Sequence, residues 1–248
     1  MPDLPSQDAS CRLGVLAFGD SVTNGGGELQ WGVALQSWAL WVARGLGMSF
    51  TSYAFDGATA ADLVNRQIPA LLSQNATPEA RYRLGCVYIG VNDVRAPEWD
   101  PASYERDLDT ALGFVDERAE RVLALTAPLD LGRPRTSAAG VRRLNAIIEH
   151  RAREAGALLL DLSDFGARNL VMTDHVHLTA LGQIAVAERA LEVLAGVGFE
   201  IRARPGALID PEITRRARLR SDTTLAYRSA KVAGRCARLR LAAGLRPR

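Results

Sequence analysis

Three residue types that can act together on an ester occur in this sequence. Ser21 directly follows the apolar run 13–18 and has glycines on both sides. A serine hydroxyl is a weak nucleophile until a neighbouring base takes its proton. Among the histidines, His177 has Asp174 three residues before it, so a single turn can place the carboxylate on the imidazole. The pattern predicts Ser21 as nucleophile, His177 as base and Asp174 as the group that orients the base.

Such a reaction also needs hydrogen-bond donors for the negative charge that develops on the carbonyl oxygen. Gly57 follows the apolar run 49–54, and no side chain obstructs its backbone N–H. Asn92 follows the run 84–89 and offers a side-chain amide. We therefore expect an oxyanion hole formed by Gly57, Asn92 and the backbone N–H of Ser21.

Three further residues lie near these positions and are candidates for substrate contacts. Trp31 precedes a predicted helix and is a candidate wall of an acyl pocket. Arg95 is a candidate partner for an anionic substrate group, with a solvated loop arginine as the alternative. His175 either lines the site or faces solvent. His175 and His177 form an H-x-H pair, but no third ligand with suitable spacing lies nearby, so we predict no metal site.

The elements that must position these groups follow from the pattern of apolar residues. Near-continuous apolar runs predict strands buried on both faces of a parallel sheet, at 13–18, 49–54, 84–89, 121–126 and 157–162. Helical periodicity lies between them, at 32–46, 60–74, 102–119, 137–155 and 180–195. Alternating strands and helices predict an α/β fold in three layers. In such folds the chemistry lies at the carboxyl ends of the strands, where Ser21, Gly57 and Asn92 all fall.

Four short motifs, in this order along the chain, resemble those of the SGNH or GDSL hydrolase family. They are Gly19-Asp20-Ser21, Gly57 with Ala58-Thr59, Gly90-Val91-Asn92-Asp93, and Asp174-His175-Val176-His177. The resemblance covers roughly residues 10–196. It implies a flavodoxin-like α/β/α sandwich around a five-stranded parallel sheet, with an open and shallow site. It also implies acyl transfer through a serine ester, without a metal or organic cofactor.

The sequence departs from the family pattern at three positions. Position 175 is histidine where the family usually has a small residue, and Ala58 stands where a polar residue often follows the glycine. Val22 replaces a leucine. None of these departures removes a catalytic group, but the first two bear on the floor of the pocket.

Charge is distributed unevenly along the chain and marks a boundary near residue 200. Residues 201–248 carry 13 Arg and Lys against 3 Asp and Glu, a net charge of +10, whereas residues 1–200 have a net charge of −8. We expect a hydrolase domain over 1–200 and an Arg-rich, helical extension over 201–248. Apolar and basic residues fall on neighbouring helical faces in 223–245. The segment 206–248 is therefore a candidate for peripheral contact with an anionic membrane or an acidic partner, with docking on its own domain and disorder as alternatives.

Composition and missing motifs exclude several classes of protein. The chain is 48% hydrophobic and 23% charged, which is typical of a folded domain. The acidic main domain argues against nucleic-acid binding. The chain has no G-x-S-x-G elbow and no G-x-G-x-x-G, and Lys231 is its only lysine, so neither an α/β-hydrolase nor a nucleotide-binding loop fits. Widely spaced cysteines, odd in number, and an N-terminus without a signal-peptide pattern predict a cytoplasmic location.

The sequence therefore predicts a cytoplasmic serine carboxylic-ester hydrolase that acts on a small ester, an acylated sugar or a lipid. An O-acyltransferase of the same fold is one alternative, because transfer to a hydroxyl instead of water depends on how the acceptor binds. A non-catalytic binding module that uses the basic tail is another, and it predicts no turnover. Acyl length, leaving group and oligomeric state stay open.

Overall fold

The computed structural model describes residues 12–74, 81–132, 136–167 and 169–242, including their side chains except those of residues 12, 221, 225, 228–229, 232–233 and 235–242. Within these residues, five parallel strands form one sheet in the order β3-β1-β4-β5-β6. The strands are β1 (Arg12–Gly19), β3 (Phe50–Ser52), β4 (Arg81–Tyr88), β5 (Val122–Leu125) and β6 (Leu158–Leu160). The predicted five-stranded parallel sheet is thereby confirmed, and each predicted apolar run overlaps one strand.

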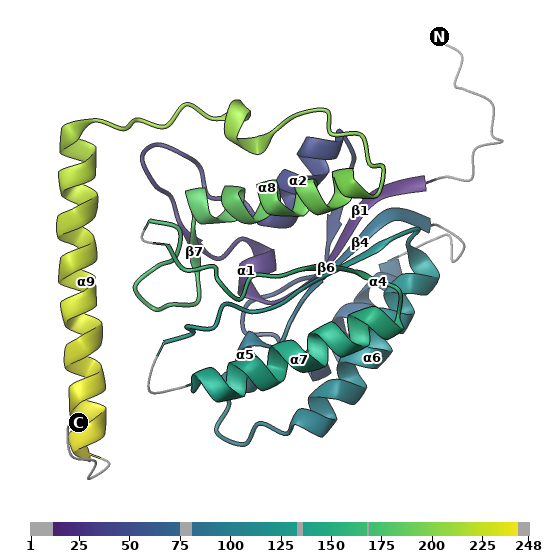
Figure 1. Cartoon of the computed structure of the whole chain (residues 1–248), viewed down its shortest axis with the longest axis horizontal. Helices are drawn as coiled ribbons and strands as arrows, with labels where there is room; N and C mark the ends of the chain where they lie inside the picture. The colour runs from purple at the N-terminus through teal and green to yellow at the C-terminus, as the bar shows by residue number, and fades with distance from the viewer. Residues whose placement is uncertain (1–11, 75–80, 133–135, 168, 243–248) are drawn as a thin grey trace.

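Strand β1 lies near the middle of the sheet. Val15 pairs with Phe50 of β3 on one side and with Leu84 of β4 on the other. Residues 15–18 are fully buried, which explains why the run is apolar at every position. In Figure 1 the chain enters β1 at the right and passes into α1 at its left end, so the carboxyl ends of the strands point to the left.

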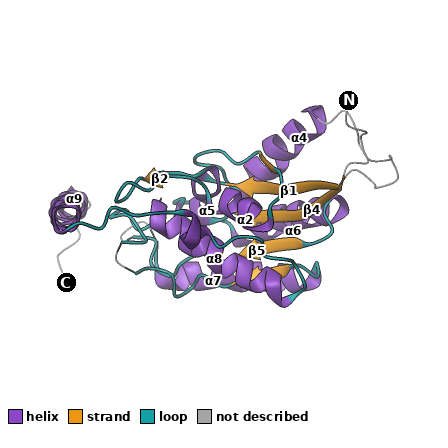
Figure 2. Cartoon of the chain, turned by 90° about the horizontal axis from the view of Figure 1, so that it is seen from above, coloured by secondary structure: helices purple, strands orange, loops and turns teal. Residues whose placement is uncertain are grey.

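Helices cover both faces of the sheet, as the three-layer prediction requires (Figures 1 and 2). Helices α2 (Trp38–Leu46) and α8 (Ala180–Gly196) pack together on one face. The other face carries α6 (Pro101–Arg118), α7 (Ala138–Glu154) and a continuous helical stretch made of α3 (Ala60–Asp62), the π-helical η1 (Leu63–Gln67) and α4 (Ile68–Gln74). Asp100 and Pro101 start α6, with the Asp100 carboxylate accepting the N–H of Ala102 at 3.0 Å.

The helix predicted over 32–46 is wrong in its first turns, because α2 begins only at Trp38. Ser37 caps the helix, and its hydroxyl accepts the N–H of Leu40 at 3.1 Å. Ahead of this cap, Gly32 has a φ of +79°, and the backbone bridge between residues 30 and 33 folds the chain into a turn. Residues 29–36 are therefore a loop.

Four short elements that periodicity did not predict hold the ends of the strands. They are α1 (Ser21–Asn24), β2 (Gly27–Glu28), α5 (Val91–Arg95) and β7 (Leu178–Thr179). Strands β2 and β7 form a separate ladder in which Gly27 pairs with Leu178. This ladder brings the chain next to His177 alongside the chain that follows Ser21.

The C-terminal extension first runs along the sandwich and then leaves it. The N–H groups of Arg202 and Ala203 donate to the carbonyl of Gly45, and the N–H of Gly206, in η2 (Pro205–Leu208), donates to Glu188 at 2.8 Å. Helix α9 (Arg215–Ala242) then stands beside the molecule, on the side to which the strand ends point (Figures 1 and 2). The sequence predicts an apolar face and a basic face over 223–245. Most of the side chains that would form them lie outside the described set, namely those of Leu225, Arg228, Val232, Arg235, Cys236, Arg238 and Leu239.

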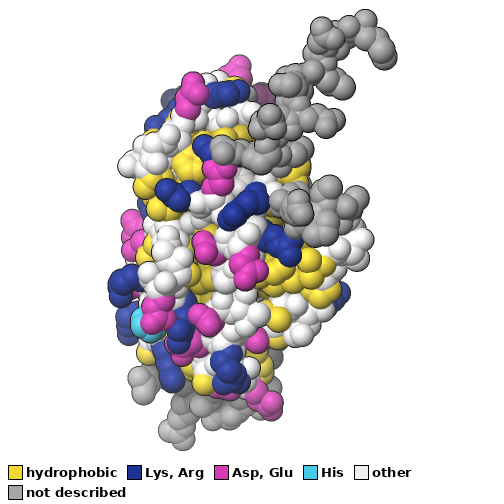
Figure 3. Space-filling view, turned by 90° about the vertical axis from the view of Figure 1, so that its right-hand side faces the viewer, with side chains coloured by type: hydrophobic (Ala, Val, Ile, Leu, Met, Phe, Trp, Pro, Cys, Tyr) yellow, Lys and Arg dark blue, Asp and Glu magenta, His cyan; other side chains and the backbone are white. Residues whose placement is uncertain are grey.

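The opposite end of the molecule has a mixed surface. Figure 3 shows this end, where arginine, acidic and apolar side chains are interspersed. In the described part of the chain, no helix combines the length and apolar character that a membrane crossing requires.

Candidate active site

The loops at the strand ends bring the three predicted catalytic residues into one hydrogen-bonded chain. Ser21 opens α1, and its Oγ lies 2.9 Å from Nε2 of His177. Nδ1 of His177 lies 2.7 Å from Oδ2 of Asp174. The other carboxylate oxygen accepts the backbone N–H groups of Val176 and His177, each at 3.0 Å, so the D-x-x-H spacing closes a turn that fixes the carboxylate. The arrangement can pass a proton from serine to imidazole.

Asp174 and His177 shift each other's ionisation. Burial by itself raises the pKa of Asp174, but hydrogen bonds from the His177 ring and from two backbone N–H groups bring this pKa down to about 2. The hydrogen bond to Asp174 raises the pKa of His177 above its ordinary value, against a smaller opposing effect of burial. A carboxylate that stays charged at neutral pH can therefore stabilise the imidazolium that forms when His177 takes a proton.

The two predicted oxyanion donors lie in loops that are tied to each other. Gly57 has a φ of +80°, and no atom lies within 4 Å of the place where a Cβ would be, so its turn faces open space. The side-chain amide of Asn92 donates one hydrogen to the carbonyl of Ala58 at 2.9 Å. An amide nitrogen carries two hydrogens, so this contact positions the second one for another acceptor.

Asp93 holds the Gly57 loop in place, a role that the sequence analysis did not assign. Its two carboxylate oxygens lie 3.1 and 3.2 Å from the N–H of Ala60. On the other side of the loop, the side-chain amide of Asn24 donates to the Asp56 carboxylate at 2.9 Å. This bond connects the Gly57 loop to α1. Burial raises the pKa of Asp93 to about 6, although the Ala60 N–H lowers it.

Two buried glutamines clamp the backbone on both sides of Ser21. Gln67, in the π-helical segment, accepts the N–H of Gly19 at 3.0 Å and donates to its carbonyl at 2.8 Å. Gln183, in α8, donates to the carbonyl of Val22 at 3.0 Å. Both are at most 1% exposed. The one sequence feature that could have pointed to these two residues is a glutamine within an apolar helical pattern.

Gly26 lets His177 approach Ser21 closely. Its N–H donates to the carbonyl of Ser21 at 2.6 Å. A Cβ at this position would lie 2.8 Å from that carbonyl and 3.2 Å from Cδ2 of His177. Any side chain here must therefore displace the turn or the imidazole.

Asp20 caps α1 from a buried position beside Ser21. One carboxylate oxygen accepts the N–H of Val22 at 2.9 Å, and the other is buried without a hydrogen-bond partner among the described residues. Burial raises the pKa of Asp20 to about 7, although the Val22 N–H and the charge of His177 lower it. This geometry agrees with a bracing acceptor for the loop.

The three candidates for substrate contacts are placed differently from one another. Arg95 donates to the carbonyl of Leu131 and so supports the loop after β5. His175 is exposed, has a φ of +63°, and its Nδ1 lies 2.9 Å from Asp130 of the same loop. Trp31 is half-buried in a hollow beside α9.

Comparison with known protein sequences shows the family of the chain. A sequence model of the GDSL-like Lipase/Acylhydrolase family matches residues 17–185. This stretch begins in β1 and ends in α8, and it contains Ser21, Gly57, Asn92, Asp174 and His177. No curated protein sequence matches the chain.

Solved structures share the fold at low sequence identity. LAE5, described as an α/β hydrolase enzyme from the metagenome of Lake Arreo in Spain, superposes with a TM-score of 0.60 at 17% identity, over 74% of this chain and 95% of its own. Axe2, an acetylxylan esterase from Geobacillus stearothermophilus, superposes with a TM-score of 0.56 at 18% identity, over 79% of this chain and 100% of its own. Because the family match spans more than half of the sequence, the chain belongs to the GDSL-like lipase/acylhydrolase family and is an ester hydrolase.

Proposed function

We propose that the chain is a serine carboxylic-ester hydrolase that works through an acyl-enzyme on Ser21. The observation that carries this proposal is the unbroken chain from Ser21 Oγ to His177 at 2.9 Å and from His177 to Asp174 at 2.7 Å. Structures of Axe2 described as catalytic mutants replace a serine, an aspartate and a histidine, with the aspartate three residues before the histidine, as in this chain.

In the first half of the reaction, Ser21 Oγ attacks the acyl carbonyl carbon while its proton passes to Nε2 of His177. The negative charge on the carbonyl oxygen is held by the backbone N–H groups of Ser21 and Gly57 and by the Asn92 amide. Asp174 stabilises the imidazolium through the hydrogen bond to Nδ1. His177 then gives its proton to the alkoxide oxygen as the ester bond breaks, so an alcohol leaves and the acyl group stays on Ser21.

In the second half, water takes the place of the alcohol. His177 accepts a proton from the water as its oxygen attacks the acyl carbon, and the same donors hold the oxyanion. The imidazolium returns the proton to Ser21 Oγ when the acyl–serine bond breaks, which releases the carboxylic acid and restores the enzyme.

The proposed substrates are small esters, acylated sugars and lipids. Neither the family match nor the fold favours the two alternatives, acyl transfer to a hydroxyl and a non-catalytic binding module. The named activity of Axe2 agrees with an acylated sugar among these substrates.

The test is a burst experiment with p-nitrophenyl acetate. The native chain should release p-nitrophenol in a fast phase equal to the enzyme concentration, followed by slower turnover. Ser21→Ala should show neither phase. Ser73→Ala is the matched control, because this exposed hydroxyl donates to the nearby carbonyl of Ala70 at 2.9 Å, and the variant should behave as the native chain does. Equal turnover by Ser21→Ala would refute the proposal.

We also propose a cytoplasmic location and a peripheral contact of 206–248 with an anionic membrane or an acidic partner. The odd number of cysteines supports the first, and the net charge of +10 over 201–248 supports the second. Co-sedimentation with anionic liposomes tests the membrane contact. It should be lost at high salt, and an intact chain that stays in the supernatant at low salt would exclude it.

A further inference from the structure

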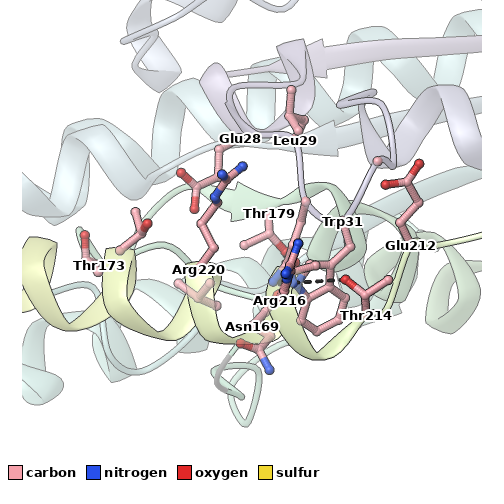
Figure 4. Close-up of a pocket in the computed structure, with 15 residues that line it drawn as sticks. Glu28, Leu29, Trp31, Asn169, Thr173, Thr179, Glu212, Thr214, Arg216 and Arg220 are labelled. Carbon is pink, nitrogen blue, oxygen red and sulfur yellow. Dashed lines mark hydrogen bonds between the residues drawn. The ribbon is translucent and has the colours of Figure 1, made fainter.

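A hollow of about 570 Å³ lies between α9 and the body of the molecule (Figure 4). Its walls come from residues 28–32, from residues between 169 and 179, and from residues of the extension between 212 and 224. The family match ends at residue 185, so the extension adds one wall of its own to the family domain. The volume is that of a pocket for a small molecule.

The first turns of α9 are fixed against the loop that carries Trp31. The N–H of Glu212 donates to the carbonyl of Trp31 at 2.8 Å, and the Glu212 side chain lies beside Gly32. The Thr214 hydroxyl caps the helix by accepting the N–H of Ala217 at 3.1 Å. These contacts fix the first turn of α9, which forms one wall of the hollow, relative to the loop at residues 28–32, which forms another.

Two neighbouring residues in this lining carry buried polar atoms without partners. The indole Nε1 of Trp31, a donor, and the side-chain oxygen of Gln30, an acceptor, are both buried and make no hydrogen bond within the described residues. A buried polar group that lacks a partner destabilises the protein unless something else pairs with it. The loop at residues 30 and 31 therefore carries polar groups that no contact within the described residues satisfies.

The backbone around the hollow is strained. Among the described residues, three that are not glycine have a positive φ, and two of them, Trp31 at +49° and Asn169 at +76°, line the hollow. This conformation is unfavourable for a bulky residue such as tryptophan. Strain of this kind is concentrated at binding and catalytic sites, where it holds a side chain in a functional position.

The remaining lining indicates the class of ligand. The carboxylates of Glu28 and Glu212 balance the guanidinium groups of Arg216 and Arg220, and the hydroxyls of threonines 173, 179, 214 and 224 add further polar groups. In Figure 4 Arg220 reaches from α9 towards Glu28, and the Trp31 indole points towards the first turns of α9. Balanced charges and a flat aromatic face suit a neutral ring with many hydroxyls.

The hollow is joined to the catalytic residues through short pieces of chain. Thr173 precedes Asp174, and Thr179 follows His177 by two residues. Thr179 pairs with Glu28 in the β2–β7 ladder. Gly26 directly precedes this ladder, and a Cβ at Gly26 would lie 3.2 Å from Cδ2 of His177. A ligand in the hollow therefore lies beside the segment that holds the catalytic base.

We propose that this hollow binds a saccharide unit, which is the sugar part of the ester substrate, with its ring against Trp31. The proposal rests on the proposed ester hydrolysis, because it names the alcohol that the enzyme releases. Trp31 then contacts the sugar and not the acyl group that the sequence analysis assigned to it.

The first experiment measures binding without turnover. Isothermal titration of the full-length Ser21→Ala chain with xylotriose, cellotriose and maltotriose should give a dissociation constant for at least one of them. Adding Trp31→Ala or Arg220→Ala should weaken that binding about tenfold, which corresponds to the loss of about 1.4 kcal/mol. Arg218→Ala and Tyr227→Ala are matched controls on the same helix, exposed and outside the lining, and should leave binding unchanged. Trp31→Phe keeps a flat ring and should retain part of the affinity.

Three results of the titration would overturn the proposal. They are the absence of binding to all three trisaccharides, binding that is equally strong after Trp31→Ala and Arg220→Ala, and competition in which inorganic phosphate displaces the sugar through Arg216 and Arg220. The last result would identify an anion site.

The second experiment separates this proposal from the proposed function. In an active background, Trp31→Ala should lower kcat/KM for acetylated xylose relative to kcat/KM for p-nitrophenyl acetate by about tenfold. An unchanged ratio refutes the saccharide site while ester hydrolysis stands. A native chain that binds a trisaccharide but hydrolyses neither ester refutes the proposed function while the site stands.

Discussion

At the scale of single residues, the proposed mechanism depends on a histidine made more basic by its aspartate. Catalysis needs neutral His177, whose pKa lies above 6.5 because Asp174 bonds to the ring. The value of kcat/KM should therefore rise with pH through a midpoint above 6.5. Asp174→Asn removes the charged partner that raises the pKa of His177, so the midpoint should fall. The same substitution should lower kcat by about 10³–10⁴. A pH profile with the same midpoint in both proteins would contradict the pairing.

Substitution of Asn92 tests the proposed oxyanion hole. Replacing it by alanine removes one donor and should lower kcat by about 10²–10³, with a much smaller change in KM. The variant also loses the bond to Ala58, so circular dichroism and thermal unfolding should confirm that it folds. An unchanged kcat in a folded variant would remove Asn92 from the mechanism.

Asp20 is expected to weaken the fold as pH rises. Its pKa is about 7 in the folded chain against 3.8 in an unfolded one, so stability falls as pH rises from about 4 to about 7. Asp20→Asn keeps an acceptor for Val22 and removes the charge. Its gain in free energy of unfolding, measured in urea, should be about 3 kcal/mol larger at pH 8.5 than at pH 5. A gain that does not depend on pH would mean that the carboxyl does not titrate in this range.

The triad could be predicted from the sequence because its members carry reactive groups, and their positions relative to a strand and to each other indicate how they can meet. Ser21 follows a buried strand, and Asp174 precedes His177 by one turn. Gln67 and Gln183 could not be found in this way, because their amides act on backbone groups that only the folded chain brings near. Asp93 was quoted within a motif, but its bond to Ala60 joins residues 33 positions apart.

At the scale of elements, a short turn of chain sets the distance between serine and histidine. Gly26→Ala places a Cβ against the Ser21 carbonyl and near the His177 ring, so it should lower kcat/KM by about 10–100-fold. Gly166→Ala is the matched control, since no atom lies within 4 Å of its Cβ position and its backbone is ordinary. That variant should stay within about twofold of the native chain. Equal effects of the two substitutions would show that the Gly26 contact does not position the base.

Elements that contain a buried apolar run or a clear helical period were predictable, and elements without such a pattern were not. Strands β1 and β4 are buried on both faces, so their apolar runs have no competing explanation. Helix α2 was predicted six residues too early, because the apolar residues before it belong to a loop that ends at the Ser37 cap. The β2–β7 ladder is two residues long in each strand, which is too short for any periodicity.

At the scale of the whole molecule, the division of charge corresponds to a division of space. The acidic region carries the sheet and the triad, while the basic extension first binds to α2 and α8 and then forms α9 on the side of the strand ends (Figure 1). The distribution of charge along the sequence predicts a boundary near residue 200. The hollow beside α9 was not predictable, because it joins residues 28–32 to residues of the extension that lie 180 or more positions later.

The central claim is that Ser21 is an activated nucleophile, and intact-mass spectrometry after incubation with a fluorophosphonate tests it most directly. The probe reacts with an activated serine whatever the natural substrate is. The native chain and Ser73→Ala should each gain the mass of one adduct, and Ser21→Ala should gain none. A folded native chain without an adduct, or the same adduct on Ser21→Ala, would contradict the account.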